Sequence, residues 1–251
     1  MLETTLVRVA DGVHLVHGSS TNWVILSEGD AVTLIDCGYP GDRELLLRTL
    51  SELGHAPESV VAVLVTHAHS DHIGSAEYFS RVHGTPVHLH ETEVPHARRE
   101  FLDQVGVGRV LCSAWRPSVL HWAVHALRSG GTSDVRVTAP EPLPDTAGGP
   151  LDLPGRPVPV HTPGHTAGHC AYVLPRHGVL VSGDALVTGH PTSRVKGPQL
   201  LPVMFDKDRR RALESLGFIE DTASDILLPG HGPVHHGPIA HAVCRARELA
   251  S

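Results

Sequence analysis

His67-Ala68-His69-Ser70-Asp71-His72 holds four side chains that can bind a metal within six residues, and this stretch decides the predicted fold. It follows an apolar run at residues 60–65, which predicts a buried strand, and precedes Gly74-Ser75-Ala76, where a helix is expected to begin. A strand that ends in such a cluster places the side chains at the carboxyl end of a sheet. The sequence therefore predicts a metal site at this edge.

The residue types in this stretch indicate the chemistry of the metal. Imidazole suits zinc, iron, copper and nickel, and a carboxylate adds a harder oxygen ligand, so a mixed His and Asp set points to a transition-metal hydrolytic or redox centre. The chain contains 21 histidines, and the alternative is a histidine-rich surface turn that arose by chance. Three further clusters downstream favour the metal site.

The composition is that of a globular protein with an acidic surface. A chain of 251 residues with 41% hydrophobic content is long enough for a large core, and we expect residues 1–251 to form a single domain. The net charge of -7 argues against a nucleic-acid partner, because phosphate binding requires clustered Lys and Arg. The basic cluster at residues 207–211 is interrupted by Asp208 and is typical of a solvated helix face.

The sequence shows no sign of a membrane span or an export signal. No stretch approaches the ~20 apolar residues that cross a bilayer, and the first five residues lack a basic region followed by an apolar one. We therefore expect a cytoplasmic protein with no membrane partner. The sequence leaves the oligomeric state open, and a homodimer is compatible with it.

The cysteines are scattered without paired spacing, so a disulfide framework is not expected. We interpret all of them as buried free thiols, because free cysteine is among the most buried residue types. One of them stands between Asp36 and Gly38 at a predicted strand end, and its role is left open. The cysteines are Cys37, Cys112, Cys170 and Cys244.

The first ninety residues alternate between predicted strands and helices. Short apolar or alternating runs bounded by turn residues predict an antiparallel meander, and leucines at helical spacing predict a helix between Asp42 and Gly54. A second helix is expected from Asp71 to His83. The predicted strands cover residues 6–9, 13–17, 23–27, 31–35, 60–65 and 86–90.

Residues 91–133 form an insert that interrupts this alternation of strands and helices. The insert contains no predicted strand, and a helix is expected over residues 117–128. The aromatic side chains of this insert either pack it onto the body or make it a helical lid over the pocket. Residues 187–202, rich in Gly and Pro, are a second candidate for a loop that closes over the site. Large apolar side chains that either belong to the core or form a wall for an acyl group are Trp23, Trp115, Trp122, Met204 and Phe205.

The second half of the chain follows a proline-rich approach at residues 139–159. Candidate ligands lie on both sides of this approach and must converge, so we interpret it as a surface loop inside one domain. Strands followed by helices, twice over, predict two α/β halves packed sheet to sheet. Strands are expected over residues 158–161, 170–174, 179–182 and 226–228, and helices over residues 206–221 and 238–250.

Three strand-end motifs complete the candidate site. A Pro-Gly loop over residues 161–169 offers three imidazoles, Val181-Ser182-Gly183-Asp184 ends a strand in a carboxylate, and Leu228-Pro229-Gly230-His231-Gly232 ends another in histidine. Each motif alone is typical of an ordinary turn. Together with the first cluster, they form an ordered series that coincidence does not easily supply.

With these motifs in this order, the chain resembles the metallo-β-lactamase-fold superfamily over nearly its whole length, from about residue 13 to 238. The resemblance implies an α/β fold, a four-layer αββα sandwich with the metals at one edge of the sheets. His161 and His169 match no ligand position and are interpreted as structural or as partners that orient the ligating histidines. The implied ligands are His67, His69 and His165 for the first metal, Asp71, His72 and His231 for the second, and Asp184 as the bridge.

The resemblance further implies a metal-dependent hydrolase. Two metal ions about 3.5–4 Å apart can share a hydroxide that attacks an ester, thioester, lactone or amide carbonyl at neutral pH. We expect two zinc ions, with iron or manganese as alternatives. Asp71 is expected to act in catalysis by helping to orient the hydroxide. The sequence contains no Gly-x-Ser-x-Gly elbow that would offer a serine nucleophile instead.

Asp184 narrows the choice among branches of that superfamily. True β-lactamases of the superfamily generally lack an aspartate there, whereas lactonases and thioesterases resembling glyoxalase II have it, so a small acyl substrate such as a thioester or lactone is preferred. The chain departs from glyoxalase II in its insert and in lacking a basic C-terminal segment. The alternative from another class is an iron-dependent persulfide dioxygenase. A β-lactamase and an RNA-processing nuclease are less favoured.

Overall fold

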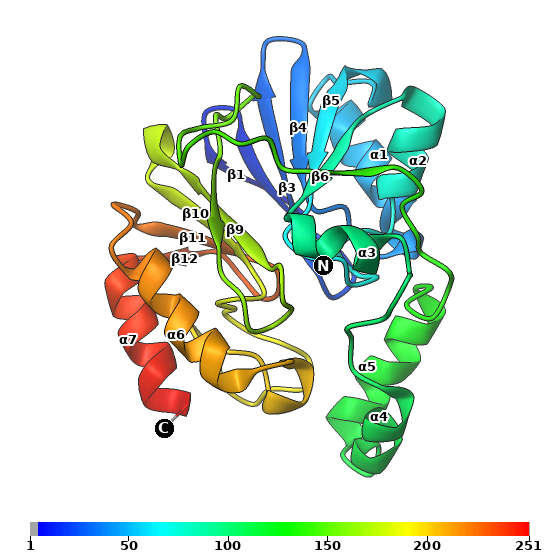
Figure 1. Cartoon of the computed structure of the whole chain (residues 1–251), viewed down its shortest axis with the longest axis vertical. Helices are drawn as coiled ribbons and strands as arrows, with labels where there is room; N and C mark the ends of the chain where they lie inside the picture. The colour runs from blue at the N-terminus through cyan, green and yellow to red at the C-terminus, as the bar shows by residue number, and fades with distance from the viewer. Residues whose placement is uncertain (1–4, 251) are drawn as a thin grey trace.

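Two β-sheets packed face to face form the centre of the molecule, with helices on their outer faces (Figure 1). The structure is a computed structural model and describes residues 5–250. The expectation about an export signal concerned residues 1–5, of which residues 1–4 lie outside the described part. Helix, sheet, sheet and helix follow one another through the molecule, so the predicted four-layer αββα sandwich is confirmed.

The first sheet runs in chain order, antiparallel from β1 to β4 and parallel from β4 to β7. The predicted meander is therefore confirmed. The last strand lies in the proline-rich approach and was not predicted, because proline usually argues against a strand. It is tolerated there because an edge strand needs donors on one side only. The strands are β1 (Leu6–Ala10), β2 (Val13–His17), β3 (Asn22–Glu28), β4 (Ala31–Ile35), β5 (Val60–Leu64), β6 (Val87–Leu89) and β7 (Pro140–Pro142).

Helices α1 (Arg43–Glu52) and α2 (Ala76–His83) cover the outer face of this sheet. The expected beginning of the second helix at Gly74-Ser75-Ala76 is confirmed, whereas a helix already from Asp71 is wrong, because residues 71–75 form turns and bends. Besides local turn bonds, their backbone makes bonds to the neighbouring loop: the N–H of Cys37 donates to the carbonyl of His72, and the N–H of Gly74 donates to the carbonyl of Gly38, both at 2.8 Å. These bonds hold the metal-binding stretch against the end of β4.

The second sheet has the order β12-β11-β10-β9-β8. Because β10 and β11 are parallel, the segments that follow them leave the sheet at the same edge. Helices α6 (Arg209–Glu220) and α7 (Ile239–Ala250) cover its outer face. The strands are β8 (Val158–His161), β9 (Cys170–Leu174), β10 (Val179–Gly183), β11 (Ile226–Pro229) and β12 (His235–His236).

The insert is helical, with α3 (Val94–Ala97), α4 (Val107–Ser113) and α5 (Pro117–Arg128). The predicted helix over residues 117–128 is confirmed. Figure 1 shows α4 and α5 extending away from the sandwich as an arm. Short 3-10 helices cover Pro40–Asp42, Pro57–Ser59, Glu91–Glu93, Pro175–His177 and Val203–Phe205.

The inner faces of the two sheets share one apolar core. Leu15 and Leu26 from the first sheet and Leu228 from the second are fully buried in it. The hydroxyl of Tyr172 on β9 donates to the carbonyl of Val65 at 3.0 Å, which joins the two sheets directly behind the metal-binding stretch. Burial of each large apolar side chain contributes roughly 1.5–3 kcal/mol. This core fixes the edges of the two sheets beside each other.

The expectation that every cysteine is buried is wrong for two of them. Cys37 and Cys170 are buried, whereas Cys112 and Cys244 are exposed, and all are free. Cys112 lies on the arm, away from both sheets, and Cys244 lies on the outer side of α7. No helix within residues 5–250 is long and apolar enough to cross a membrane.

Candidate metal centre

Strand ends from both sheets bring the predicted ligands together. β5 leads into the first cluster, β10 leads into Asp184, and β11 leads into His231. His165 lies in the loop between β8 and β9. Every predicted ligand is buried except Asp71, whose side chain is 17% exposed. The strand-end rule that predicted the site therefore describes how the sequence builds it.

Three imidazoles converge in the first half of the centre. Nδ1 of His69 lies 2.9 Å from Nε2 of His67 and 3.1 Å from Nε2 of His165, and the two Nε2 atoms are 3.2 Å apart. Nitrogens this close around one point match the face of a tetrahedron around zinc, where each Zn–N bond is about 2.0–2.1 Å.

The second half pairs imidazoles with carboxylates. Oδ2 of Asp71 lies 3.5 Å from Nε2 of His231 and 3.8 Å from Nε2 of His72. Asp184 lies between the halves: its Oδ1 is 3.5 Å from Nε2 of His72, and its Oδ2 is 3.4 Å from Nε2 of His165 and 3.3 Å from Nε2 of His231. This is the position that the predicted bridging role requires.

The two halves differ in electrostatics. Burial, reinforced by neighbouring imidazoles, lowers the pKa of His67 and of His69 well below the ordinary value. Burial also opposes the charge on His72 and His231, but the carboxylates around them, Asp184 first, raise the pKa of both overall. The imidazoles of His67 and His69 are therefore neutral, and their lone pairs are free for a metal, as ligation requires.

Two of the buried polar atoms that lack a hydrogen-bond partner in the described part of the chain lie 3.5 Å apart at the centre. Nε2 of His72 and Oδ1 of Asp184 make no hydrogen bond within residues 5–250. A buried polar atom without a partner is costly, and a cation between these atoms would satisfy both. Three groups, each with ligand atoms within 4.8 Å of one another, could hold an ion: His67, His69 and His165; His67, His72 and Asp184; and Asp71, His72 and His231.

Comparison with known proteins agrees with this geometry. The family model described as the metallo-beta-lactamase superfamily matches residues 17–231. The chain belongs to the metallo-beta-lactamase superfamily. Metallo-beta-lactamase domain-containing protein 1 of Xenopus laevis is 30% identical over 222 residues, which cover 86% of this chain and 75% of that protein. The probable metallo-hydrolase YflN of Bacillus subtilis is 26% identical over 245 residues, or 90% of this chain and 85% of that protein.

Among solved structures, the metallo-beta-lactamase family protein TTHA1429 from Thermus thermophilus is similar to this chain with a TM-score of 0.69 and 25% identity. The match covers 97% of this chain and 81% of that one. The superfamily assignment therefore rests on sequence and on fold together.

In this superfamily member, the second ring nitrogen of four of the five candidate histidines has a hydrogen-bond partner, and that of His165 faces a carboxylate without a hydrogen bond. Such partners set the tautomer and the orientation of metal-binding imidazoles. None of them was predicted, although Asp36 follows a buried strand, as Asp184 does. The contacts are His67 Nδ1 to Thr66 Oγ1 at 3.0 Å, His69 Nε2 to the carbonyl of Asp103 at 2.6 Å, His72 Nδ1 to Asp36 Oδ2 at 2.8 Å, His165 Nδ1 to Asp206 Oδ1 at 3.5 Å, and His231 Nδ1 to the carbonyl of Ser20 at 2.7 Å.

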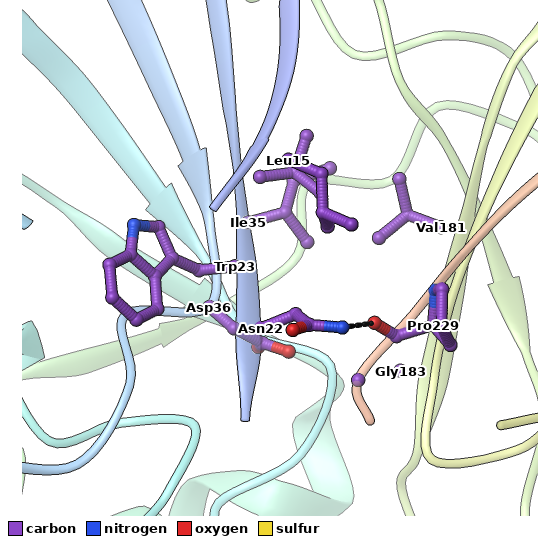
Figure 2. Close-up of a pocket in the computed structure, with 10 residues that line it drawn as sticks. Leu15, Asn22, Trp23, Ile35, Asp36, Val181, Gly183 and Pro229 are labelled. Carbon is purple, nitrogen blue, oxygen red and sulfur yellow. Dashed lines mark hydrogen bonds between the residues drawn. The ribbon is translucent and has the colours of Figure 1, made fainter. Parts of the chain in front are cut away.

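Two further side chains clamp the ligand loops. Glu93 is buried and accepts hydrogen bonds from the backbone N–H groups of Ala68, at 3.0 Å, and Gly168, at 2.9 Å. It thus joins the first cluster to the loop that carries His165. Figure 2 shows the amide of Asn22 directed at Pro229, to whose carbonyl it donates at 2.9 Å. Asn22 thereby ties β3 to the segment that carries His231.

The remaining histidine motifs have no place among the ligand atoms. Nε2 of His169 accepts from the N–H of Asp184 at 3.0 Å, so this imidazole supports the backbone of the bridging residue. His161 stacks on His90 at the surface, with ring centroids 3.9 Å apart. Both observations agree with the structural or orienting roles that we expected for them.

The predicted apolar wall is correct only in part. Trp122 and Phe205 line a cavity beside the centre, and Met204 lines the neighbouring cavity. Trp23 belongs to the core, and Trp115 is 81% exposed on the arm. The cavity also contains His190, from the predicted loop 187–202, which the sequence did not single out. Its ring lies 4.9 Å from that of His231.

Proposed function

We propose that this protein is a dinuclear metal-dependent hydrolase that cleaves an ester-like bond, a thioester, a lactone or a related acyl compound. The observation that carries the proposal is the position of Asp184, whose two oxygens lie 3.3–3.5 Å from imidazoles of both halves of the centre. The chemistry of the donor set suits zinc, with iron or manganese as alternatives.

The candidate ligands form two groups, one for each metal ion. His67, His69 and His165 would hold the first ion, and Asp71, His72 and His231 the second, with Asp184 between them. When bound, such ions lower the pKa of water to about 7 and polarise a carbonyl oxygen. Asp71 is the only partly exposed member of the set. This exposure supports a role for Asp71 in orienting the attacking water toward a substrate in the cavity.

The substrate proposed is a small molecule. The cavity beside the centre has a volume of about 310 Å³, within the range of small-ligand sites. The net charge of -7 gives no electrostatic attraction for nucleic acid.

Metal analysis of the purified protein, coupled to a panel of lactones, thioesters and β-lactams, tests the proposal. We expect two equivalents of metal and turnover of lactones or thioesters that is lost on chelation and regained on adding zinc. His67→Ala and Asp184→Ala should each lose metal and turnover while circular dichroism stays unchanged. Activity insensitive to chelation would contradict the proposal, as would a single iron with oxygen uptake on a persulfide.

A further inference from the structure

The cavity beside the metal centre has two chemically different ends. His69, Asp71 and Asp184 line the end at the centre. The other end is lined by the arm, through Val110 and Leu111 of α4 and through Leu127 of α5, and Trp122 of α5 lies between the two ends, with its ring 5.9 Å from that of His190. A substrate whose reacting carbonyl lies at the centre must therefore place one of its substituents against the arm.

The described residues that line this cavity include no Lys and no Arg. Its only carboxylates are Asp71 and Asp184, both at the metal centre. An anionic group at the arm end would lose the part of its water that the apolar side chains displace and would gain no partner of opposite charge, which is costly. The cavity thus selects against a charge on the substituent that lies there.

A second cavity, of about 370 Å³, meets the first beside His165. Gln104, Val105 and Phe205 also line both. The second cavity is polar, because its lining includes Arg109, Lys207 and Asp206. The centre therefore lies where an apolar compartment and a polar compartment meet, and the two ends of a substrate are offered different environments.

We infer that the substrate is an acyl compound whose acyl group is uncharged and apolar and lies against α4 and α5, while its polar leaving group lies in the second cavity. This inference rests on the proposed hydrolase function and names its substrate class. The arm is then the element that determines specificity.

A series of thioesters with one leaving group, N-acetylcysteamine, tests the inference on the zinc-loaded protein. Acetyl, butyryl, hexanoyl and octanoyl thioesters differ only in apolar length. Each methylene buried against the arm should raise kcat/KM by about fourfold until the cavity is full. The adipoyl thioester, which ends in a carboxylate, should react about 10-fold more slowly than the hexanoyl thioester, because its charge loses part of its water and gains no partner.

Two matched variants of the arm locate the effect. Leu111 and Leu120 are both exposed leucines on neighbouring helices, at 68% and 51%, but only Leu111 lines the cavity. Leu111→Arg should lower the octanoyl-to-acetyl ratio of kcat/KM by about tenfold and should improve the adipoyl thioester, since it supplies the missing cation. Leu120→Arg should change neither.

The outcomes distinguish a failure of the inferred substrate class from a failure of the hydrolase function. Metal-dependent hydrolysis at equal rates for acetyl and octanoyl thioesters, or for hexanoyl and adipoyl thioesters, would contradict the inference that an apolar acyl group lies against the arm. The proposed hydrolase function would not be affected by that result. Equal effects of Leu111→Arg and Leu120→Arg would remove the arm from specificity. Absence of hydrolysis of every ester, thioester and lactone by the zinc-loaded protein would overturn the hydrolase function and the inference with it.

Discussion

Oδ2 of Asp36 lies 2.8 Å from Nδ1 of His72 and orients Nε2 of that imidazole toward Asp184. The same carboxylate accepts from the N–H and the hydroxyl of Thr66, both at 2.8 Å, and that hydroxyl lies 3.0 Å from Nδ1 of His67. Asp36 therefore positions one imidazole in each half of the centre. Its φ of 61° is a left-handed backbone conformation that Asp and Asn adopt more readily than other side chains.

Replacement of Asp36 should weaken metal binding without unfolding the protein. Asp36→Asn keeps the shape and tolerates the left-handed backbone, but removes the charge that holds the two imidazoles. Loss of such an orienting partner typically costs about 10–100-fold in metal affinity. Competition with a chromogenic chelator measures the affinity, and the exposed Asp30→Asn is the control. An Asp36→Asn protein that binds zinc as tightly as the wild type would refute the positioning role.

Glu93 gives the protein a pH-dependent component of stability. Burial raises the pKa of this carboxyl, but the hydrogen bond and charge of His96, 3.0 Å away, lower it overall below the ordinary value of 4.5. A carboxyl whose pKa is lower in the folded state stabilises that state above the unfolded value, and the contribution is lost as pH falls below it. The clamp between the ligand loops is therefore sensitive to acid.

Glu93→Gln tests this clamp. At pH 7 the variant should have a free energy of unfolding lower by about 2 kcal/mol, because the charged acceptor of two backbone N–H groups is lost. As pH falls below 4.5, the ordinary pKa of this carboxyl, the difference between the two proteins in free energy of unfolding should shrink. Urea unfolding of both proteins with chelator present gives the measurement. A difference that stays constant with pH would show that the Glu93 charge contributes nothing.

The thiols should divide into two classes. Burial raises the pKa of Cys37 above its ordinary value and that of Cys170 to about 12, whereas Cys112 and Cys244 are exposed. Since the thiolate is the reactive form, two thiols should react quickly with a disulfide reagent in the folded protein, and the other two only after unfolding. The double variant Cys112→Ser, Cys244→Ser should show no fast reaction. A fast thiol in that variant would mean that Cys37 or Cys170 is accessible.

One physical rule allowed the sequence to predict that several of the candidate ligands lie together in the folded chain. Strands that end in His or Asp deliver these side chains to a common sheet edge, and His67, Asp184 and His231 all obey that rule. The same rule applies to Asp36, which follows β4. Asp36 was not predicted as a functional residue, because a single aspartate after a strand is also typical of an ordinary turn and no spaced motif surrounds it.

The residues that orient and support the candidate ligands could not be predicted from such local patterns. Glu93 and Asp103 belong to the insert, and they act on Ala68 and His69 through contacts that depend on the path of the folded chain. Asp103 acts through its backbone carbonyl, which every residue type possesses. The turn at residues 71–75 was missed for a related reason: helical spacing is visible in sequence, whereas backbone bonds to a distant loop are not.

His190 should donate a hydrogen bond to the substrate. Thr192 contacts Nδ1 of His190 through its N–H, at 3.2 Å, and through its hydroxyl, at 2.7 Å; when both groups donate to Nδ1, the proton of the neutral ring lies on Nε2. Burial, followed by the neighbouring His231, lowers the pKa of His190 to about 3, so the ring stays neutral at physiological pH. Because His190 lines the cavity beside Asp184 and His231, its Nε2–H can stabilise negative charge that develops on a substrate oxygen.

His190→Phe should therefore lower kcat by about 100-fold with unchanged metal content, since loss of one such donor costs about 10²–10³ in rate. His190→Gln retains a donor and should recover part of the loss. The acid limb of the pH–rate profile should be the same in the wild type and His190→Gln, because the imidazole does not titrate in that range. Equal rates for the Phe and Gln variants would show that the ring only fills space, and a loss of metal in the Phe variant would place its effect on His231 instead.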